Sequence, residues 1–126
     1  MTAPDRLPSH LAGDSTWRAA LHVLTAHPFA SDPRVWSHVD LDQAWIDWPA
    51  LLAEGWSPAV AALLVAVAQL WGNGPTGGIP RLDLDDLVTR LDDRNWRLLL
   101  GALAIRRAGL RGSAWPLDLA RLLKEA

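Results

Sequence analysis

Two short acidic runs are the first candidates in this chain for a functional site, because their carboxylates are closely spaced. Asp40 and Asp42 lie in one run, and Asp83, Asp85 and Asp86 lie in the other. Clustered carboxylates are typical ligands of Ca²⁺ and Mg²⁺, but neither run has the glycine at the sixth position and the glutamate at the twelfth that a calcium loop needs. We therefore predict that these acids cap helices, because negative charge is favourable at a helix N-terminus, and we expect no metal or other cofactor.

Histidines are the second group of candidates. No two of them have the four-residue spacing of paired zinc ligands on one helix, and the chain has no cysteine. The motifs GxSxG and GxxxxGK[ST] are absent, and the stretch GNGPTGG lacks the lysine of a phosphate-binding loop. We therefore expect no catalytic residue and no enzyme activity. The histidines are His10, His22, His27 and His38.

The charge of the chain is divided unevenly along its length. Residues 90–126 carry seven Arg and one Lys against four acids, whereas residues 1–89 carry four Arg against ten acids. A basic end suits nucleic acid or an acidic partner, and the same asymmetry also suits two halves that attract each other within one fold or between two copies.

The nucleic-acid alternative rests on a pair of helices predicted in residues 84–107. Two helices joined by a short turn outline a helix-turn-helix, whose second helix would present Arg94, Asn95 and Arg97 to base edges. Against this interpretation, the second helix is rich in leucine and begins beside Asp92 and Asp93, which would face phosphates. The arginines left for phosphate contacts would be Arg90, Arg106, Arg107 and Arg111.

Small residues form a stripe on the same helix. Arg94, Arg97, Gly101, Ala104 and Ala108 share one face of a helical wheel. Small side chains let a second helix approach closely, so we predict that a protein partner or a second copy of the chain docks there. The alternative interpretation is an ordinary exposed face. The residues assigned to partner binding are Arg94, Arg97, Gly101, Arg106 and Arg107.

The elements that position these residues are predicted to be helices. Leu and Ala make up about a third of the chain, and their side chains lose little freedom in a helix. The most apolar stretch, residues 58–71, follows the start signal Ser57-Pro58 and is too short to span a membrane, which takes about 20 residues. We predict an all-α fold, a compact bundle of five to six helices around this apolar central helix.

Capping residues mark where the earlier helices begin. Asp14 precedes a helix that ends before Pro28, Asp40 precedes a short helix through Ile46, and Asp47 precedes another that stops at Gly55. The segment from His27 to Val39 is expected to be a loop, pinned by Phe29 and Trp36.

The later helices and the ends of the chain complete the predicted organisation. Helices are expected at residues 84–91, at residues 93–107 before Gly109, and from Pro116 toward the end. Residues 1–13 contain two prolines and no long apolar run, so we expect a disordered lead-in and no signal peptide. Residues 14–126 are expected to form a single helical domain.

Eight tryptophans accompany one Phe and no Tyr. Each indole can bury about 150–250 Å² and anchors either a core or an interface. Because the tryptophans are spread along the whole chain, we expect no single aromatic cluster. The absence of cysteine excludes disulfides and fits a reducing, cytoplasmic location.

The segments LLVAVAQLWGNG and LDDRNWRLLLGALAIRRAG are an apolar helix ending in Trp and Gly-Asn-Gly, then a capped helix with Asn and an aromatic. This order resembles small uncharacterised helical proteins of high-GC bacterial genomes, over about residues 45–109. The resemblance implies a single helical domain and no particular activity.

Taken together, the residues predict a small helical protein-interaction module whose partner is another protein or a second copy of the chain. The alternative is a helix-turn-helix DNA-binding protein that uses the helix pair at residues 84–107.

Overall fold

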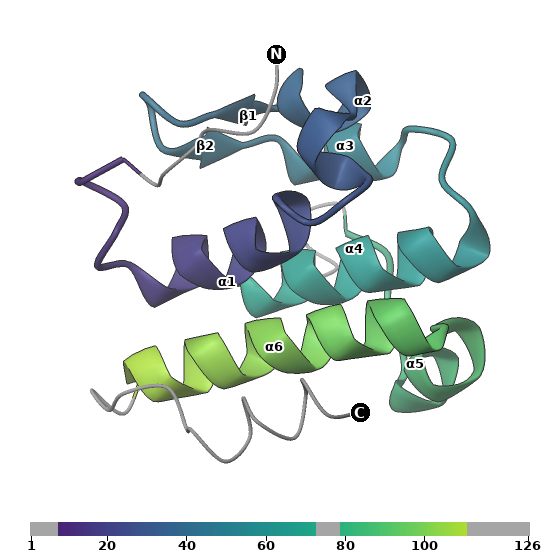
Figure 1. The fold of residues 1–126 in the computed structure, drawn as a ribbon. Helices are drawn as coiled ribbons and strands as arrows, with labels where there is room; N and C mark the ends of the chain where they lie inside the picture. The colour runs from purple at the N-terminus through teal and green to yellow at the C-terminus, as the bar shows by residue number, and fades with distance from the viewer. Residues whose placement is uncertain (1–7, 73–78, 111–126) are drawn as a thin grey trace.

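The chain folds mainly into helices, with one small two-stranded sheet, in a computed structural model that describes residues 8–72 and 79–110 (Figure 1). The predicted helical class is confirmed, whereas the sheet was not expected. In chain order the elements are α1 (Ser15–Leu24), the 3-10 helix η1 (Phe29–Ser31), α2 (Pro33–Trp36), β1 (Val39–Asp40), β2 (Trp45–Ile46), α3 (Trp48–Leu52), α4 (Pro58–Leu70), α5 (Leu84–Arg90) and α6 (Asp93–Leu110).

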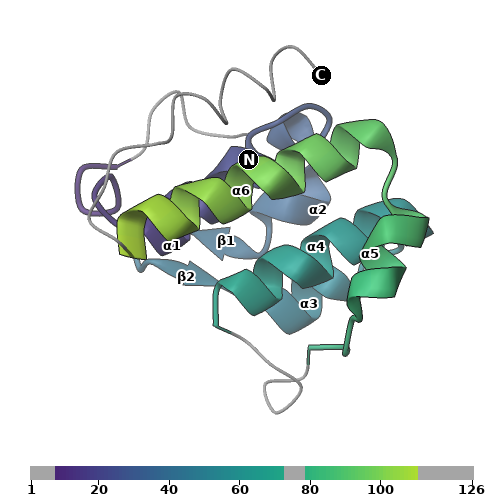
Figure 2. The same cartoon turned by 90° about the horizontal axis from the view of Figure 1, so that it is seen from below.

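The elements form three layers. α1 and α4 make the middle layer, α6 lies below them, and the hairpin with α2 and α3 lies above (Figure 1). α6 packs against both α1 and α4, and α5 lies beside the N-terminal end of α6 (Figure 2). None of the described helices has both the length and the apolar character that crossing a membrane requires.

Carboxylate and hydroxyl caps start the helices where the sequence predicts. Asp14 accepts a hydrogen bond from the backbone N–H of Thr16 at the start of α1, and Asp92 accepts one from Asn95 at the start of α6. Ser57 caps α4, whose Pro58 occupies the first turn. These side chains satisfy N–H groups that have no partner within the helix.

The hairpin β1–β2 replaces the short helix that we predicted between Asp40 and Ile46. Val39 pairs with Ile46 and both are buried, whereas Asp40 and Trp45 form the next pair and both are exposed. The alternating pattern of a strand therefore suits this segment better than the pattern of a helix. It buries the aliphatic side chains of Val39 and Ile46 and leaves Asp40 exposed to solvent. Trp45 consequently has 63 % of its surface exposed.

The segment from His27 to Val39, expected to be a loop, contains η1 and α2. The expected anchors are both buried, and they are joined directly, since the indole N–H of Trp36 donates to the carbonyl oxygen of Phe29 at 3.0 Å. The segment is thus more regular than predicted, but it is held by the two aromatic residues that the sequence singles out.

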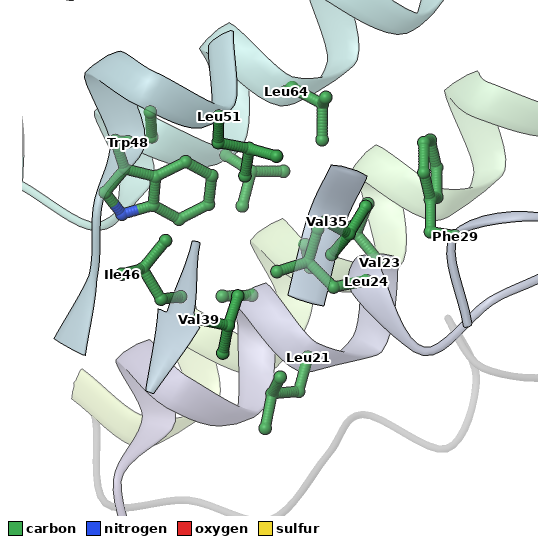
Figure 3. Close-up of a cluster of buried hydrophobic side chains, with 14 of the residues drawn as sticks. Leu21, Val23, Leu24, Phe29, Val35, Val39, Ile46, Trp48, Leu51 and Leu64 are labelled. Atoms are coloured by element: carbon green, nitrogen blue, oxygen red, sulfur yellow. The ribbon is translucent and has the colours of Figure 1, made fainter. Parts of the chain in front are cut away.

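Much of the core lies between the upper and middle layers, where apolar side chains of α1, α4, the hairpin and α3 meet (Figure 3), and it extends to Leu99 and Ala102 of α6. Leu64 and Val67 of α4 are at most 1 % exposed, as a central apolar helix requires. Three tryptophans that are distant in sequence also meet, because Trp71 lies edge-on to Trp17 at 4.6 Å and to Trp48 at 5.9 Å. The expectation of no aromatic cluster is therefore wrong.

The two ends of the described chain differ from expectation in detail. Residues 8–13 of the expected lead-in form turns, and Leu11 is buried in the core. At the other end, α6 runs through Gly109 instead of closing there. The helix predicted from Pro116 lies outside the described residues, as do residues 1–7 of the lead-in.

Candidate functional site

The small-residue face of α6 is covered by α1 of the same chain. Gly101 lies against His22, because a Cβ atom at Gly101 would overlap the imidazole ring. A Cβ atom at Gly109 would likewise overlap the side chain of Ser15, and Ala104 is buried as well. The close helix approach that the stripe predicts therefore occurs within the chain, and Gly101 is not available to a partner.

The four arginines assigned to partner binding are not on one surface. Arg106 donates from Nη1 to the hydroxyl oxygen of Ser15 at 2.8 Å and is half-buried, so it belongs to the contact between α1 and α6. Arg94, Arg97 and Arg107 are exposed. Arg107 lies about 15 Å along the helix from Arg97, because each residue advances a helix by about 1.5 Å. Only Arg94 and Arg97 are therefore close neighbours.

Burial lowers the pKa of His22 below the ordinary value of 6.5. The physical cause is the loss of hydration, which disfavours the protonated imidazolium more than the neutral ring. The ring packs against Gly101 although the residue as a whole keeps contact with solvent. Within residues 8–72 and 79–110, no three His, Asp or Glu residues are grouped so that they could hold a metal ion.

The two acidic runs serve local structure. Asp40 accepts a hydrogen bond from the backbone N–H of Gln43 at 3.0 Å and so stabilises the turn of the hairpin instead of the predicted helix. In the second run, Asp86 accepts from the backbone N–H of Asp83 and lies 3.5 Å from Arg90 one turn later. The predicted capping role is thus confirmed for the second run only.

A wide hollow of about 700 Å³ lies beside the hairpin. Two of its polar side chains are engaged by neighbouring groups: His38 Nε2 lies 2.9 Å from Glu54 Oε1, and Asp47 accepts from the backbone N–H of Ala50. The first contact joins the start of the hairpin to the turn after α3, and the second caps the N-terminus of α3. The hollow is lined by Trp36, Ser37, His38, Val39, Asp40, Leu41, Asp42, Trp45 and Asp47.

The helix pair α5 and α6 has the short connection of a helix-turn-helix, but its side chains are placed differently from what that interpretation needs. Asn95, expected to reach a base, is only 7 % exposed. Trp96 beside it is exposed, and Asp93 lies at the end of α6 that would enter the groove. An apolar and partly acidic surface is poorly suited to a phosphate backbone.

An exposed apolar surface lies at the corner between α5 and α6, which are adjacent in Figure 2. Leu84 is 81 % exposed, Val88 is 69 % exposed and Trp96 is 37 % exposed; we call these three residues the corner patch. A shallow hollow of about 200 Å³ is lined by Val88, Leu91, Asp93 and Trp96, so α5 and α6 contribute to one continuous surface.

Exposed charged residues lie on the first turns of α6, which also carry Trp96 of the corner patch. They are Asp93, Arg94 and Arg97, of which Asp93 lines the same hollow as Val88 and Trp96. None of them forms an ion pair with another residue of the part that the structure describes, whereas Asp86 and Arg90 of α5 pair with each other. Asp93 therefore lies at the edge of the patch, and Arg97 follows one turn later on α6, without an ion pair among the described residues.

The helical pattern of α5 predicts that the residues of the corner patch on this helix are buried, so the sequence alone does not reveal the patch. Leu84, Leu87, Val88 and Leu91 fall on one arc of α5, which predicts a fully buried apolar face. In the structure, Leu87 and Leu91 pack against the core, whereas the other two face solvent. Which half of such an arc is buried depends on the angle between α5 and the rest of the molecule.

Models of protein families, curated proteins and solved structures were each compared with the chain, and none of the three comparisons gives a match.

Proposed function

We propose that the chain is a non-catalytic protein-interaction module that binds a protein partner through the corner patch. The observation that carries this proposal is the exposure of Leu84 and Val88, one turn apart on α5, and of Trp96, which lines the same hollow as Val88. Covering apolar surface is worth about 25 cal/mol per Å² removed from water, and neighbouring exposed apolar residues rimmed by charge are typical of binding surfaces.

The composition of the patch also fits a protein partner better than a nucleic acid. Tryptophan is enriched at binding hot spots, and a polar rim around an apolar centre is the usual anatomy of a protein interface. Duplex DNA would instead require a basic surface, whereas here Leu84 and Val88 project from the same corner as Asp93. The absence of cysteine supports a cytoplasmic setting for the interaction.

Site-specific photo-crosslinking in cells that make the full chain tests the proposal. A photoreactive residue at Val88 is expected to give one or a few adducts of constant mass, because the partner must cover that position. The same residue at Gln43, exposed in the hairpin turn of the opposite layer, is the matched control. Adducts at Val88 should disappear when Leu84→Asp is added. Equal products from both positions, or none from Val88, would overturn the proposal.

A further inference from the structure

We infer that the partner of the corner patch is a second copy of this chain, packed about a two-fold axis. This inference rests on the proposed function, since it names the occupant of the same surface. Its basis is the charge beside the patch: Asp93 and Arg97, both exposed, stand one turn apart on the face of α6 that also carries Trp96. A surface that carries both signs beside an apolar centre can complement itself.

The order of these residues along α6 sets a definite register for two antiparallel copies. In a two-fold contact, residue i of one copy meets residue j of the other and residue j meets residue i. If the helices cross at the level of Asn95, Asp93 of each copy lies opposite Arg97 of the other.

The exposed side chains suit the roles that this arrangement gives them. Asp93 and Arg97 meet close to the crossing, where ion pairs fix partner and register more than they add strength. Trp96 lies beside them, and Leu84 and Val88 of α5 extend the covered apolar surface, which contributes most of the affinity. The module thus self-associates through α5 and α6 and keeps α1 and the hairpin free.

Sedimentation of the purified full chain over micromolar to millimolar concentrations provides the first measurement. We expect a monomer–dimer equilibrium that Val88→Asp shifts to monomer. The single charge reversals Asp93→Lys and Arg97→Glu should each weaken the dimer by about tenfold or more, because each places two like-charged pairs across the interface. Arg107→Glu, an exposed reversal farther along α6, should leave the dimer unchanged.

Mixing the two single variants provides the decisive measurement. In a mixed dimer, Lys at position 93 of one chain meets Glu at position 97 of the other, and the native Arg97 meets the native Asp93. Equimolar Asp93→Lys and Arg97→Glu should therefore associate to within a few-fold of the native dimer, although each alone does not. An ion pair within one helix could not produce this result, because each variant chain keeps like charges at both positions.

Each outcome has a clear meaning. A native chain that stays monomeric at millimolar concentration, or a mixture that associates no better than its components, overturns the two-fold self-association. The proposed function is separately judged by the Val88 adducts: an adduct with the mass of two chains supports both proposals. An adduct with a different protein supports the proposed function and overturns this inference. Circular dichroism of the single variants checks that they fold as the native chain does.

Discussion

The imidazole of His22 on α1 occupies the space above Gly101 where a side chain of α6 would otherwise lie. The missing side chain on one helix thus makes room for the ring on the other. This pair holds α1 close to α6 near the middle of α6, and the contact between Gly109 and Ser15 does the same near its end. The two helices are fitted to each other along most of the length of α1.

Adding a methyl group at Gly101 should destabilise the protein. The native ring cannot keep its place beside a Cβ atom, so we expect Gly101→Ala to lower the free energy of unfolding by about 1–3 kcal/mol, the usual cost of overpacking. In a His22→Ala background the clash is gone, and the same change should stabilise by about 0.5–1 kcal/mol, because Ala favours the helix. Urea unfolding of the four proteins measures this change of sign. Equal effects in both backgrounds would show that the two residues do not interact.

The lowered pKa of His22 makes stability depend on pH. Above the unfolded-state pKa of about 6.5 the ring is neutral in both states, so the full stability is present. As the pH falls below this value, the unfolded chain takes up a proton more readily than the folded one, and stability decreases until the folded-state pKa is reached. His22→Gln should remove this part of the decrease, whereas the control change His27→Gln should retain it. Urea unfolding between pH 7.5 and pH 5 tests the difference, which must be absent if His22 is not the group responsible.

Two buried tryptophans provide a matched comparison of hydrogen bonding. Trp36 and Trp48 are both 1 % exposed, but only Trp36 donates its indole N–H, to Phe29. The N–H of Trp48 has no acceptor among the residues that the structure describes. Trp36→Phe removes one buried hydrogen bond to the Phe29 carbonyl, which still accepts from the backbone N–H of Asp32, whereas Trp48→Phe removes an unpaired donor. We therefore expect Trp36→Phe to cost about 0.5–1.5 kcal/mol more in thermal or urea unfolding. A larger loss for Trp48→Phe would contradict this assignment.

Neighbouring arginines on α6 separate a structural role from a surface role. Arg106→Ala removes the hydrogen bond to Ser15 and should lower the free energy of unfolding by about 1 kcal/mol or more. Arg107→Ala, one residue later and exposed, should change it by less than about 0.5 kcal/mol. Thermal unfolding of the two variants gives the comparison. Similar losses in both would mean that Ser15 is not the partner that matters.

Local signals predicted the parts of the fold that depend on neighbouring residues. Ser57 and Pro58 begin α4 as expected, and Asp47 begins α3, because a cap needs only the next three residues to act. The hairpin was not predicted because it depends on residues that are not neighbours in the sequence. An aspartate such as Asp40 caps a turn as readily as a helix, and the choice was made by the pairing of Val39 with Ile46 across the turn.

In the candidate site, too, the sequence predicted what depends on one helix alone and not what depends on how helices pack. The sequence indicates that small residues of α6 admit a second helix, but a helical wheel holds no information about which helix that is. His22 of α1 packs against Gly101, so Gly101 is not available to a partner. Arg94 and Arg97 remain exposed. The corner patch was missed because Leu84 and Val88 look like core residues until the angle of α5 is known.

The contact between α1 and α6 has a consequence for how the protein is made. These helices stand at opposite ends of the described chain, so the contact closes a loop of most of its residues, and closing a long loop delays folding. On the ribosome, α1 emerges first and must wait with its apolar face uncovered until α6 follows. The helical domain therefore folds only after α6 has been synthesised, and chains that stop before α6 are expected to aggregate or be degraded.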